Sequence, residues 1–468
     1  MRVVWWVWML ALAVPAWGQD DQAPYSVLLL TVDALRADRM SLYGHEQPTT
    51  PYLESLVRDE AVAFDNAFAV GGWTSPGMVS MLTGYTPLTH QQHARHTQYD
   101  DAMPSAMRLL RQRRMITMGK SASGGTFGGV GIRYEMGVDS SLESVVEYMG
   151  DHPDKRVLAW VHIKETHLPY APSPINRRRF GGDTHQSDAL DVVRSWSVIY
   201  KDVSQVPSWL KNPGEVVFDE ADRATVPKLY DGCVADADER IGRALERLRE
   251  LGQLERTLVV ISADHGEELF DHGWLGHAST GYEGKLFDEF THIPLVLRLP
   301  DGSASGHRQA LVDQTDVMPT VFELLGVQDT LAVPMQGHSL VPVVQGRADA
   351  VRETTVAHST RKGWTTPRDE LGQRITAVRS LDHKLVIWPD GRRAYYDLGA
   401  DPDELRPLDS IPQASVLDGA HAAWLEQGRQ AAGELVHLAG KTRLEDLQAA
   451  VADGDLDGAL DEARCGVL

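Results

Sequence analysis

The stretch LVVISADHGEELFDHGWLGH, residues 258–277, constrains the fold of this chain more than any other. Its first four residues are apolar and largely β-branched, which is typical of a buried strand. The preceding segment 237–253 predicts an amphipathic helix, because its large aliphatic residues share one face and a glycine follows them. A helix followed by a buried strand is half of an α/β crossover unit. We therefore expect an α/β fold with a large, mostly parallel sheet flanked by helices.

Polar residues follow several of the expected strands. Asp264 and His265 come directly after the strand just described, Asp33 ends another apolar run at 27–32, and His167 follows a third. In sheets of this kind, ligands bind beyond the carboxyl ends of the strands. Taken singly, each residue could also cap a helix or lie in a solvated loop. Together they would form a site at one edge of the sheet.

The segment VGGWTSPGMVSMLTG, residues 70–84, predicts a helix that starts near Pro76 and runs through Met81. Two glycines allow a sharp turn before it, and proline suits the first turn of a helix. Thr74 or Ser75 would then lie at the helix N-terminus, where backbone N–H groups and the helix dipole favour an anion. An ordinary N-cap hydroxyl is the alternative interpretation.

Further elements are expected along the chain. They are a helix and short strand in 48–69, a strand at 294–300, a helix at 310–327, a hairpin at 384–398 and a helical region from about 414. The expected units are a signal peptide (1–18), a catalytic domain (24–345), a smaller α+β subdomain with the hairpin (346–413) and a helical acidic tail (414–468).

The first eighteen residues have the features of a cleaved signal peptide: Arg2, an apolar run, and a small-x-small end at Ala16-Trp17-Gly18. The apolar run is too short for a comfortable membrane span, so we expect a periplasmic or secreted protein with no membrane span after cleavage. The net charge of −21 argues against nucleic acid as a partner. The two cysteines, Cys233 and Cys465, are compatible with one disulfide or with two free thiols.

Nine segments, in order from about Ser26 to about Asp403, resemble the sulfatase branch of the alkaline phosphatase superfamily. They are VDALRAD with LYG, TPYLESL, WTSPGMVSMLTGYTP, HIKETHLPY, YDGCVADADERIGRALERL, SADHGEELFDHG with GH, LFDEFTHIPLVLRLP, DVMPTVFELLG and YYDLGADPDEL. Each segment alone is a weak signal, and their shared order makes the resemblance specific for the fold. The resemblance implies one cation bound by Asp33, Asp264, His265 and the nucleophile.

The nucleophile position departs from that of true sulfatases, whose motif is Cys or Ser, any residue, Pro, Ser or Ala, then Arg. Counting back from Leu82-Thr83-Gly84 places Thr74 at the Cys position and Met78 at the Arg position. Oxidation of threonine could give only a ketone, because its Cβ carries a methyl group, so we expect no formylglycine. Threonine here resembles the phosphodiesterases, phosphonate hydrolases and lipid phosphotransferases of the superfamily. Thr74 is therefore the expected nucleophile, with a covalent intermediate.

The resemblance implies further residues around the transferred group. His167 matches the histidine of the family's His-x-Pro segment, and His277 matches a histidine or lysine after Asp-His-Gly. Lys120 matches the lysine of a Gly-Lys-Trp-His segment whose last two residues are replaced here. Lys285 is an alternative to His277, and His272 is expected to support the site without binding.

The sequence predicts one metal ion, because no second metal-binding Asp-x-x-x-His motif precedes Asp264. Carboxylate and imidazole ligands suit Ca²⁺, Mn²⁺ or Mg²⁺. The expected activity is hydrolysis of a small anionic ester of phosphate, phosphonate or sulfate. Two alternatives stay open: a phosphotransferase that modifies an envelope lipid or glycan, and an inactive binding protein with a sulfatase fold.

Overall fold

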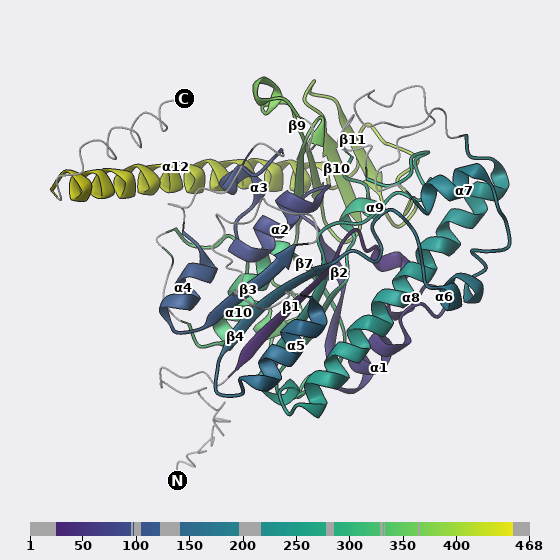
Figure 1. Cartoon of the computed structure of the whole chain (residues 1–468). Helices are drawn as coiled ribbons and strands as arrows, with labels where there is room; N and C mark the ends of the chain where they lie inside the picture. Colours follow the sequence, from purple (N-terminus) through teal and green to yellow (C-terminus); the bar gives the residue numbers. More distant parts are fainter. Residues whose placement is uncertain are drawn as a thin grey trace, which may run out of the picture.

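The computed structural model describes residues 25–94, 97, 104–121, 141–195, 217–277, 285–327, 331, 333–363 and 366–452. Within these residues, seven strands form a central sheet: β1 (Ser26–Val32), β2 (Val62–Phe68), β3 (Ile116–Ser121), β4 (Val157–Ile163), β5 (Thr257–Ala263), β6 (Leu295–Arg298) and β7 (Gly306–Asp313). Their order is β3-β4-β1-β5-β6-β2-β7. Six strands run parallel, and β6 is antiparallel to both of its neighbours. The predicted α/β sheet is confirmed (Figure 1).

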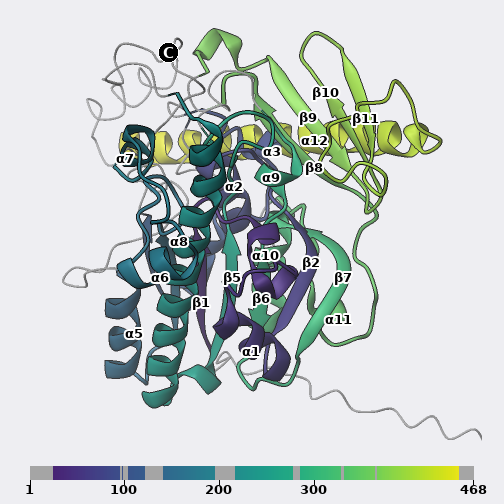
Figure 2. The same ribbon diagram turned by 90° about the vertical axis from the view of Figure 1, so that its right-hand side faces the viewer.

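Helices cover both faces of this sheet, as two views of the ribbon show (Figure 1, Figure 2). One face carries α1 (Pro51–Asp59), α5 (Leu142–Asp151) and α8 (Glu220–Glu250), and the other carries α2 (Thr74–Thr83), α4 (Ala106–Gln112) and α10 (Val317–Leu324). Along β1, Leu28 and Leu30 belong to the first core, whereas Val27 and Leu29 belong to the second. Because both faces are buried, the central strand is almost continuously apolar, which made it recognisable in the sequence.

A second, antiparallel sheet follows in the order β11-β10-β9-β8. Its strands are β8 (Thr355–Thr360), β9 (Arg374–Arg379), β10 (His383–Ile387) and β11 (Arg393–Asp397). It meets the carboxyl edge of the large sheet, because the His358 N–H donates to the carbonyl of Val70 beyond β2 and Thr355 donates to Asp313 at the end of β7. The expected smaller α+β part is therefore present, and its boundaries stay a prediction.

The remaining helices are short, except for the last one. The described chain also contains α3 (Pro87–His90), α6 (Pro174–Arg179), α7 (Asp188–Val193), α9 (Asp288–Thr291), α11 (Val341–Val344) and α12 (Ala414–Ala452). Helix α12 lies against α3, where Gly428 faces Leu88, and then extends past the body of the protein (Figure 1). The helix expected from about residue 414 is confirmed.

Two expectations about local structure need correction. Residues 310–327 are not one helix, because Ala310–Asp313 complete β7 beside β2, Gln314–Asp316 form a short 3-10 helix, and only Val317–Leu324 is α-helical. The helix expected at 237–253 begins much earlier, at Glu220, where Asp219 forms a capping box with Asp222. The strand at 294–300 is present as β6, and the hairpin at 384–398 is present as β10 and β11.

Some expectations concern residues outside the described part of the chain. The predicted signal peptide and Cys465 are among them, while Cys233 is buried on α8. In the part that the structure describes, no helix combines the length and apolar character that a membrane crossing requires.

Candidate active site at the carboxyl edge of the sheet

The ends of β1 and β5 bring two aspartates together. Val32 pairs with Ala263 in the parallel register of these strands, so the residues that follow, Asp33 and Asp264, emerge side by side. Both carboxylates are buried, with 1% and 0% of their surface exposed. Two buried carboxylates at one strand edge require compensation by hydrogen bonds or cations.

The two carboxylate oxygens of Asp264 differ in their hydrogen bonding. Oδ1 accepts the backbone N–H groups of Ala34 and His265, each at 3.0 Å. Oδ2 makes no hydrogen bond and faces Nε2 of His265 at 3.4 Å and Nε2 of His162 at 3.7 Å. A buried carboxylate oxygen without a hydrogen bond is costly unless another group satisfies it. Asp264 therefore has one buried oxygen that could bind a cation.

His162 belongs to this cluster although the sequence analysis did not single it out. It lies on β4, and its Nε2 is 3.2 Å from Oδ2 of Asp33. Burial alone would lower the pKa of His162, but the carboxylates of Asp33 and Asp264 raise it. The only signal in the sequence was a histidine within an otherwise apolar strand, VLAWVHI. That pattern also fits a hydrogen-bonded core histidine, so the register of β1 and β4 was needed to place it.

Helix α2 brings the predicted nucleophile to the same edge. Thr74 is its first residue, is 8% exposed, and places Oγ1 3.4 Å from Nε2 of His265. Nδ1 of His265 lies 2.6 Å from the carbonyl of Gly266, so Nδ1 carries the hydrogen and Nε2 presents a lone pair. The predicted residues Asp33, Thr74, Asp264 and His265 are thus brought together in one place.

The start of α2 is held closely against the strand end of β5. Gln314, which follows β7, donates from Nε2 to the carbonyl of Asp264 at 2.8 Å and accepts the N–H of Val70 at 3.0 Å. Gly77 lies so near that a Cβ there would be 2.3 Å from the Asp264 carbonyl oxygen. Met78, at the position of the family's arginine, is fully buried in the apolar core. Sequence reasoning did not identify Gln314.

The turn after β1 has an unusual backbone conformation. Ala34 adopts a φ of +61°, a left-handed conformation that is uncommon for residues other than glycine. Its carbonyl accepts the hydroxyl of Tyr230 at 2.6 Å, and nearby Arg36 donates to the carbonyl of Glu267 at 3.0 Å. These contacts maintain the strained turn and connect it to the loop after β5. Strain of this kind is frequent at functional sites.

Two further predicted histidines lie beside His265. The ring of His277 is centred 4.6 Å from that of His265 and 4.8 Å from that of His167. Nδ1 of His277 is 2.8 Å from Oε1 of Glu267, a fully buried carboxyl that the sequence analysis missed. Burial raises the pKa of Glu267 to about 8, and burial together with His167 lowers the pKa of His277 to about 4.

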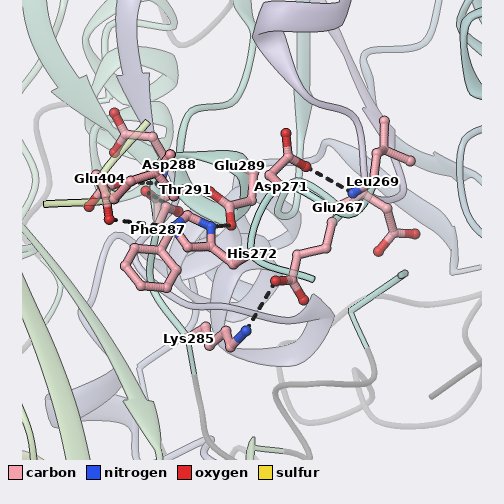
Figure 3. Close-up of polar contacts among 12 residues, drawn as sticks. Glu267, Leu269, Asp271, His272, Lys285, Phe287, Asp288, Glu289, Thr291 and Glu404 are labelled. Carbon is pink, nitrogen blue, oxygen red and sulfur yellow. Dashed lines mark hydrogen bonds and ion pairs between the residues drawn. The ribbon is translucent and has the colours of Figure 1, made fainter. Parts of the chain in front are cut away.

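Lys285 and His272 belong to a neighbouring polar cluster, which Figure 3 shows in detail. The amine of Lys285 is 3.2 Å from Oε1 of Glu268. Nδ1 of His272 is 2.6 Å from Oε1 of Glu289. Each of these basic groups is therefore paired with a glutamate. Lys120 lies at the end of β3, and its side chain is outside the part that the structure describes.

The buried donor atoms of Asp33, His162 and Asp264 could hold a single cation, because one ligand atom of each lies within 4.8 Å of the others. Neighbouring nitrogen and oxygen atoms of Asp33, His162, Asp264 and His265 are separated by 3.2 to 3.8 Å. Ligand atoms that each lie about 2.0–2.6 Å from one ion are expected at such separations. Burial alone would raise the pKa of Asp33, but the imidazoles of His167 and His162 hold it well below its usual value. The site therefore offers an ionised oxygen and imidazole lone pairs in a dry setting.

Comparison with known proteins gives two matching family models. The model described as Sulfatase matches residues 26–122 and 117–327, and the model described as N-sulphoglucosamine sulphohydrolase, C-terminal, matches residues 276–429. Among curated proteins, Arylsulfatase K of Bos taurus is 26% identical over 257 residues, which cover 51% of this chain and 45% of that protein. A multifunctional alkaline phosphatase superfamily protein of Trinickia caryophylli is 29% identical over 212 residues, which cover 43% of this chain and 39% of that protein. The chain thus spans less than half the length of these relatives.

Solved structures share the fold over most of the chain. The phosphonate monoester hydrolase of Agrobacterium radiobacter superposes with a TM-score of 0.68 at 18% identity, covering 87% of this chain and 96% of that one. A protein solved with its substrate, D-glucosamine-2-N,6-O-disulfate, gives a TM-score of 0.65 at 17% identity, and the match covers 88% of this chain and 98% of that one. At these identities the likeness establishes the fold.

Proposed function

The chain belongs to the sulfatase family, whose model it matches over residues 26–327, and from that membership we propose that it is a metal-dependent ester hydrolase with Thr74 as its nucleophile. The observation that carries this proposal is the meeting of four side chains at one buried sheet edge. Thr74 and His265 are 191 positions apart in sequence, yet their side chains are in contact. Asp33 and Asp264 complete the group.

In this proposal, Asp33, Asp264 and His265 hold one divalent cation, and the hydroxyl of Thr74 is a further donor. Such a cation, when bound, would stabilise the alkoxide form of the hydroxyl and offset negative charge on the ester. The unsatisfied Oδ2 of Asp264 and the lone pair of His265 support this ligand set.

Residues of the chain would carry out the attack on the ester and the stabilisation of the transferred group. Thr74 lies at the N-terminus of a ten-residue helix, where backbone N–H groups and the helix dipole stabilise charge that develops on the transferred group. Oγ1 loses its proton to water and attacks phosphorus, which forms a covalent ester with Thr74 and breaks the bond to the alcohol oxygen; that oxygen then needs a proton. Water then displaces Thr74 and releases the product.

The proton donor is proposed to be a histidine of the pair His167 and His277. Glu267 orients the ring of His277 through Nδ1, and the two histidine rings are in contact. The contact of Lys285 with Glu268 makes it the weaker candidate.

Phosphorus esters are the preferred substrates in this proposal. A sulfated Thr74 has no aldehyde hydrate from which sulfate could be eliminated, so water must displace the group directly. Hydrolysis of sulfate esters is the second candidate, because the matching family model is that of sulfatases and one of the named curated relatives is an arylsulfatase.

The test uses the purified full chain with its metal content measured. Wild type, Thr74→Ala, Thr74→Ser and Asp264→Ala are assayed on aryl phosphate monoesters, phosphodiesters, phosphonates and sulfates. Thr74→Ala should lose at least about 10³-fold in kcat, Thr74→Ser should keep part of the activity, and Asp264→Ala should lose both metal and activity.

Three results would contradict parts of the proposal. Full activity of Thr74→Ala would exclude it as the nucleophile, and full metal content of Asp264→Ala would exclude that ligand. Faster turnover of an aryl sulfate than of any phosphorus ester would favour the second candidate. A metal-loaded wild type that cleaves none of these esters would favour a binding protein or a transferase.

A further inference from the structure

We propose that His162 is a direct ligand of the cation and that it makes the site selective for a transition metal over Ca²⁺ or Mg²⁺. This inference rests on the proposed metal-dependent function and concerns which ion the site takes. It adds a second imidazole to a ligand set in which the sequence predicted only His265.

The sheet topology places His162 where a ligand is needed. Strands β4, β1 and β5 are adjacent, and they present His162, Asp33 and Asp264 respectively. Nε2 of His162 lies 3.2 Å from a carboxylate oxygen of Asp33 and 3.7 Å from one of Asp264. The side chain is completely buried, with 0% of its surface exposed.

The other ring nitrogen of His162 is fixed in the way that metal-binding histidines usually are. Nδ1 lies 2.8 Å from Oγ1 of Thr31, its register partner on β1. Oγ1 of Thr31 also accepts the indole N–H of Trp160 at 2.9 Å. A hydrogen bond at the second nitrogen orients an imidazole ligand and sets its tautomer. This role also accounts for a buried threonine in the apolar run SVLLLTV.

A competing interpretation is that His162 is a protonated counter-ion between two carboxylates. An imidazolium N–H in this position would donate to Asp33 or Asp264. Nε2 of His162 instead lies between the two carboxylates, 3.2 Å from Oδ2 of Asp33 and 3.7 Å from Oδ2 of Asp264, and Oδ2 of Asp264 makes no hydrogen bond to it. The arrangement therefore fits two ligands that share an ion better than it fits a direct ion pair.

A second imidazole ligand changes which metal ion the site prefers to bind. Ca²⁺ takes six to eight oxygen ligands, and Mg²⁺ is bound through oxygen with several waters. Imidazole nitrogen suits Zn²⁺ and Fe²⁺ instead. With His162 and His265 supplying nitrogen beside Asp33 and Asp264, half of the ligands from the strand ends are nitrogen. This balance favours a borderline transition metal.

The experiment measures metal binding, not catalysis. Chelator-treated full-length protein is titrated with Zn²⁺, Mn²⁺ and Ca²⁺ by calorimetry, and the visible spectrum of the Co²⁺ form is recorded. The variants are His162→Ala, Thr31→Val and His358→Ala. The last is a matched control, because His358 is a buried strand histidine of the other sheet, 1% exposed. Circular dichroism checks that each variant is folded.

We expect His162→Ala to weaken Zn²⁺ binding by at least about 10²-fold, since loss of an outer partner alone costs about 10- to 100-fold. Ca²⁺ binding should change much less, and the Co²⁺ spectrum should change. Thr31→Val should weaken transition-metal binding by about 10- to 100-fold, which keeps the inference testable if His162→Ala does not fold. His358→Ala should match wild type.

The direction in which His162→Ala changes metal affinity shows whether His162 is a metal ligand or a protonated counter-ion. If His162 were a counter-ion, its removal would take away a positive charge and strengthen metal binding. Unchanged or stronger Zn²⁺ binding in His162→Ala, or a wild type that prefers Ca²⁺, would overturn the inference and leave the proposed function standing. A wild type that binds none of these ions would overturn both.

Discussion

Replacement of Gly77 by alanine should displace the nucleophile while leaving every proposed catalytic side chain present. Gly77 is three residues after Thr74 in α2, and the first turn of this helix lies against the main chain after β5. A Cβ at this position would be 2.3 Å from the Asp264 carbonyl oxygen and 3.0 Å from the side-chain amide of Gln314. Real Cβ atoms essentially never come within 3.0 Å of such a neighbour, so the backbone must separate by at least 0.7 Å, the difference between these values.

This displacement should reduce activity more than stability. Oγ1 of Thr74 is 3.4 Å from Nε2 of His265, and it moves with the helix turn that contains Gly77. Misplacing a reacting group by about 1 Å can cost about 10²-fold in rate. Overpacking costs about 1–3 kcal/mol. The better helix propensity of alanine offsets about 1 kcal/mol of this, so the net loss of stability should be about 0–2 kcal/mol.

The assay compares kcat/KM on the best aryl phosphorus ester with the free energy of unfolding in urea. Gly433→Ala is the control, because Gly433 lies in α12 and a Cβ there would meet no atom within 4 Å. That variant should keep full activity and gain up to about 1 kcal/mol of stability. A Gly77→Ala enzyme with the kcat/KM of wild type would refute the argument, since it would mean that the position of Thr74 does not depend on close contact with Asp264.

Three further predictions test other parts of the site. Mass spectrometry of the peptide that carries Thr74 should show unmodified threonine, because its Cβ cannot become an aldehyde, and a modified neighbouring serine would contradict the alignment. His167→Ala should slow a poorly activated ester by about 10²–10⁴-fold and a nitrophenyl ester less. Equal losses on both esters would assign His167 to the anionic oxygens and leave His277 as the acid. Asp271→Asn should lower Tm near neutral pH. Although burial raises it, the pKa of Asp271 is lowered to about 2 by the guanidinium of Arg36. A carboxyl with a lowered pKa stabilises the fold above its unfolded pKa of about 3.9 and loses this effect as the pH falls. The difference in Tm should therefore shrink as the pH falls and vanish only below about pH 2, and a constant difference would indicate lost packing instead.

Local sequence determined much of the architecture. The strands that are buried on both faces gave continuous apolar runs, so β1, β4 and β5 were recognisable without knowledge of their partners. Parallel strands end at one edge, so Asp33 and Asp264 could be expected to meet there before their neighbours were known. The glycines and proline around Thr74 likewise predicted a helix that begins near Pro76, and the observed helix begins at Thr74.

Local sequence was less informative where a segment could satisfy two patterns. The sequence pattern of the helix at 317–324 can be extended back to Ala310. Ala310–Asp313 nevertheless forms the end of a strand, because it pairs with the edge of β2. Such a choice depends on a partner that is about 240 residues away in the chain, as the contact of Asn66 with Gln309 shows. Periodicity within one window cannot report it.

Tertiary structure alone decided which polar side chains meet. Thr31 and His162 are 131 positions apart, and only the register of β1 and β4 brings them into contact. The contact between Glu267 and His277, and the separate pairing of Lys285 with Glu268, depend on how the loop after β5 folds back on itself. A single residue of register shift would turn His162 to the opposite face of the sheet, because side chains alternate along a strand. Hydrophobic patterns specify which segments are buried, whereas the positions of ligand atoms depend on contacts between segments that the patterns do not encode.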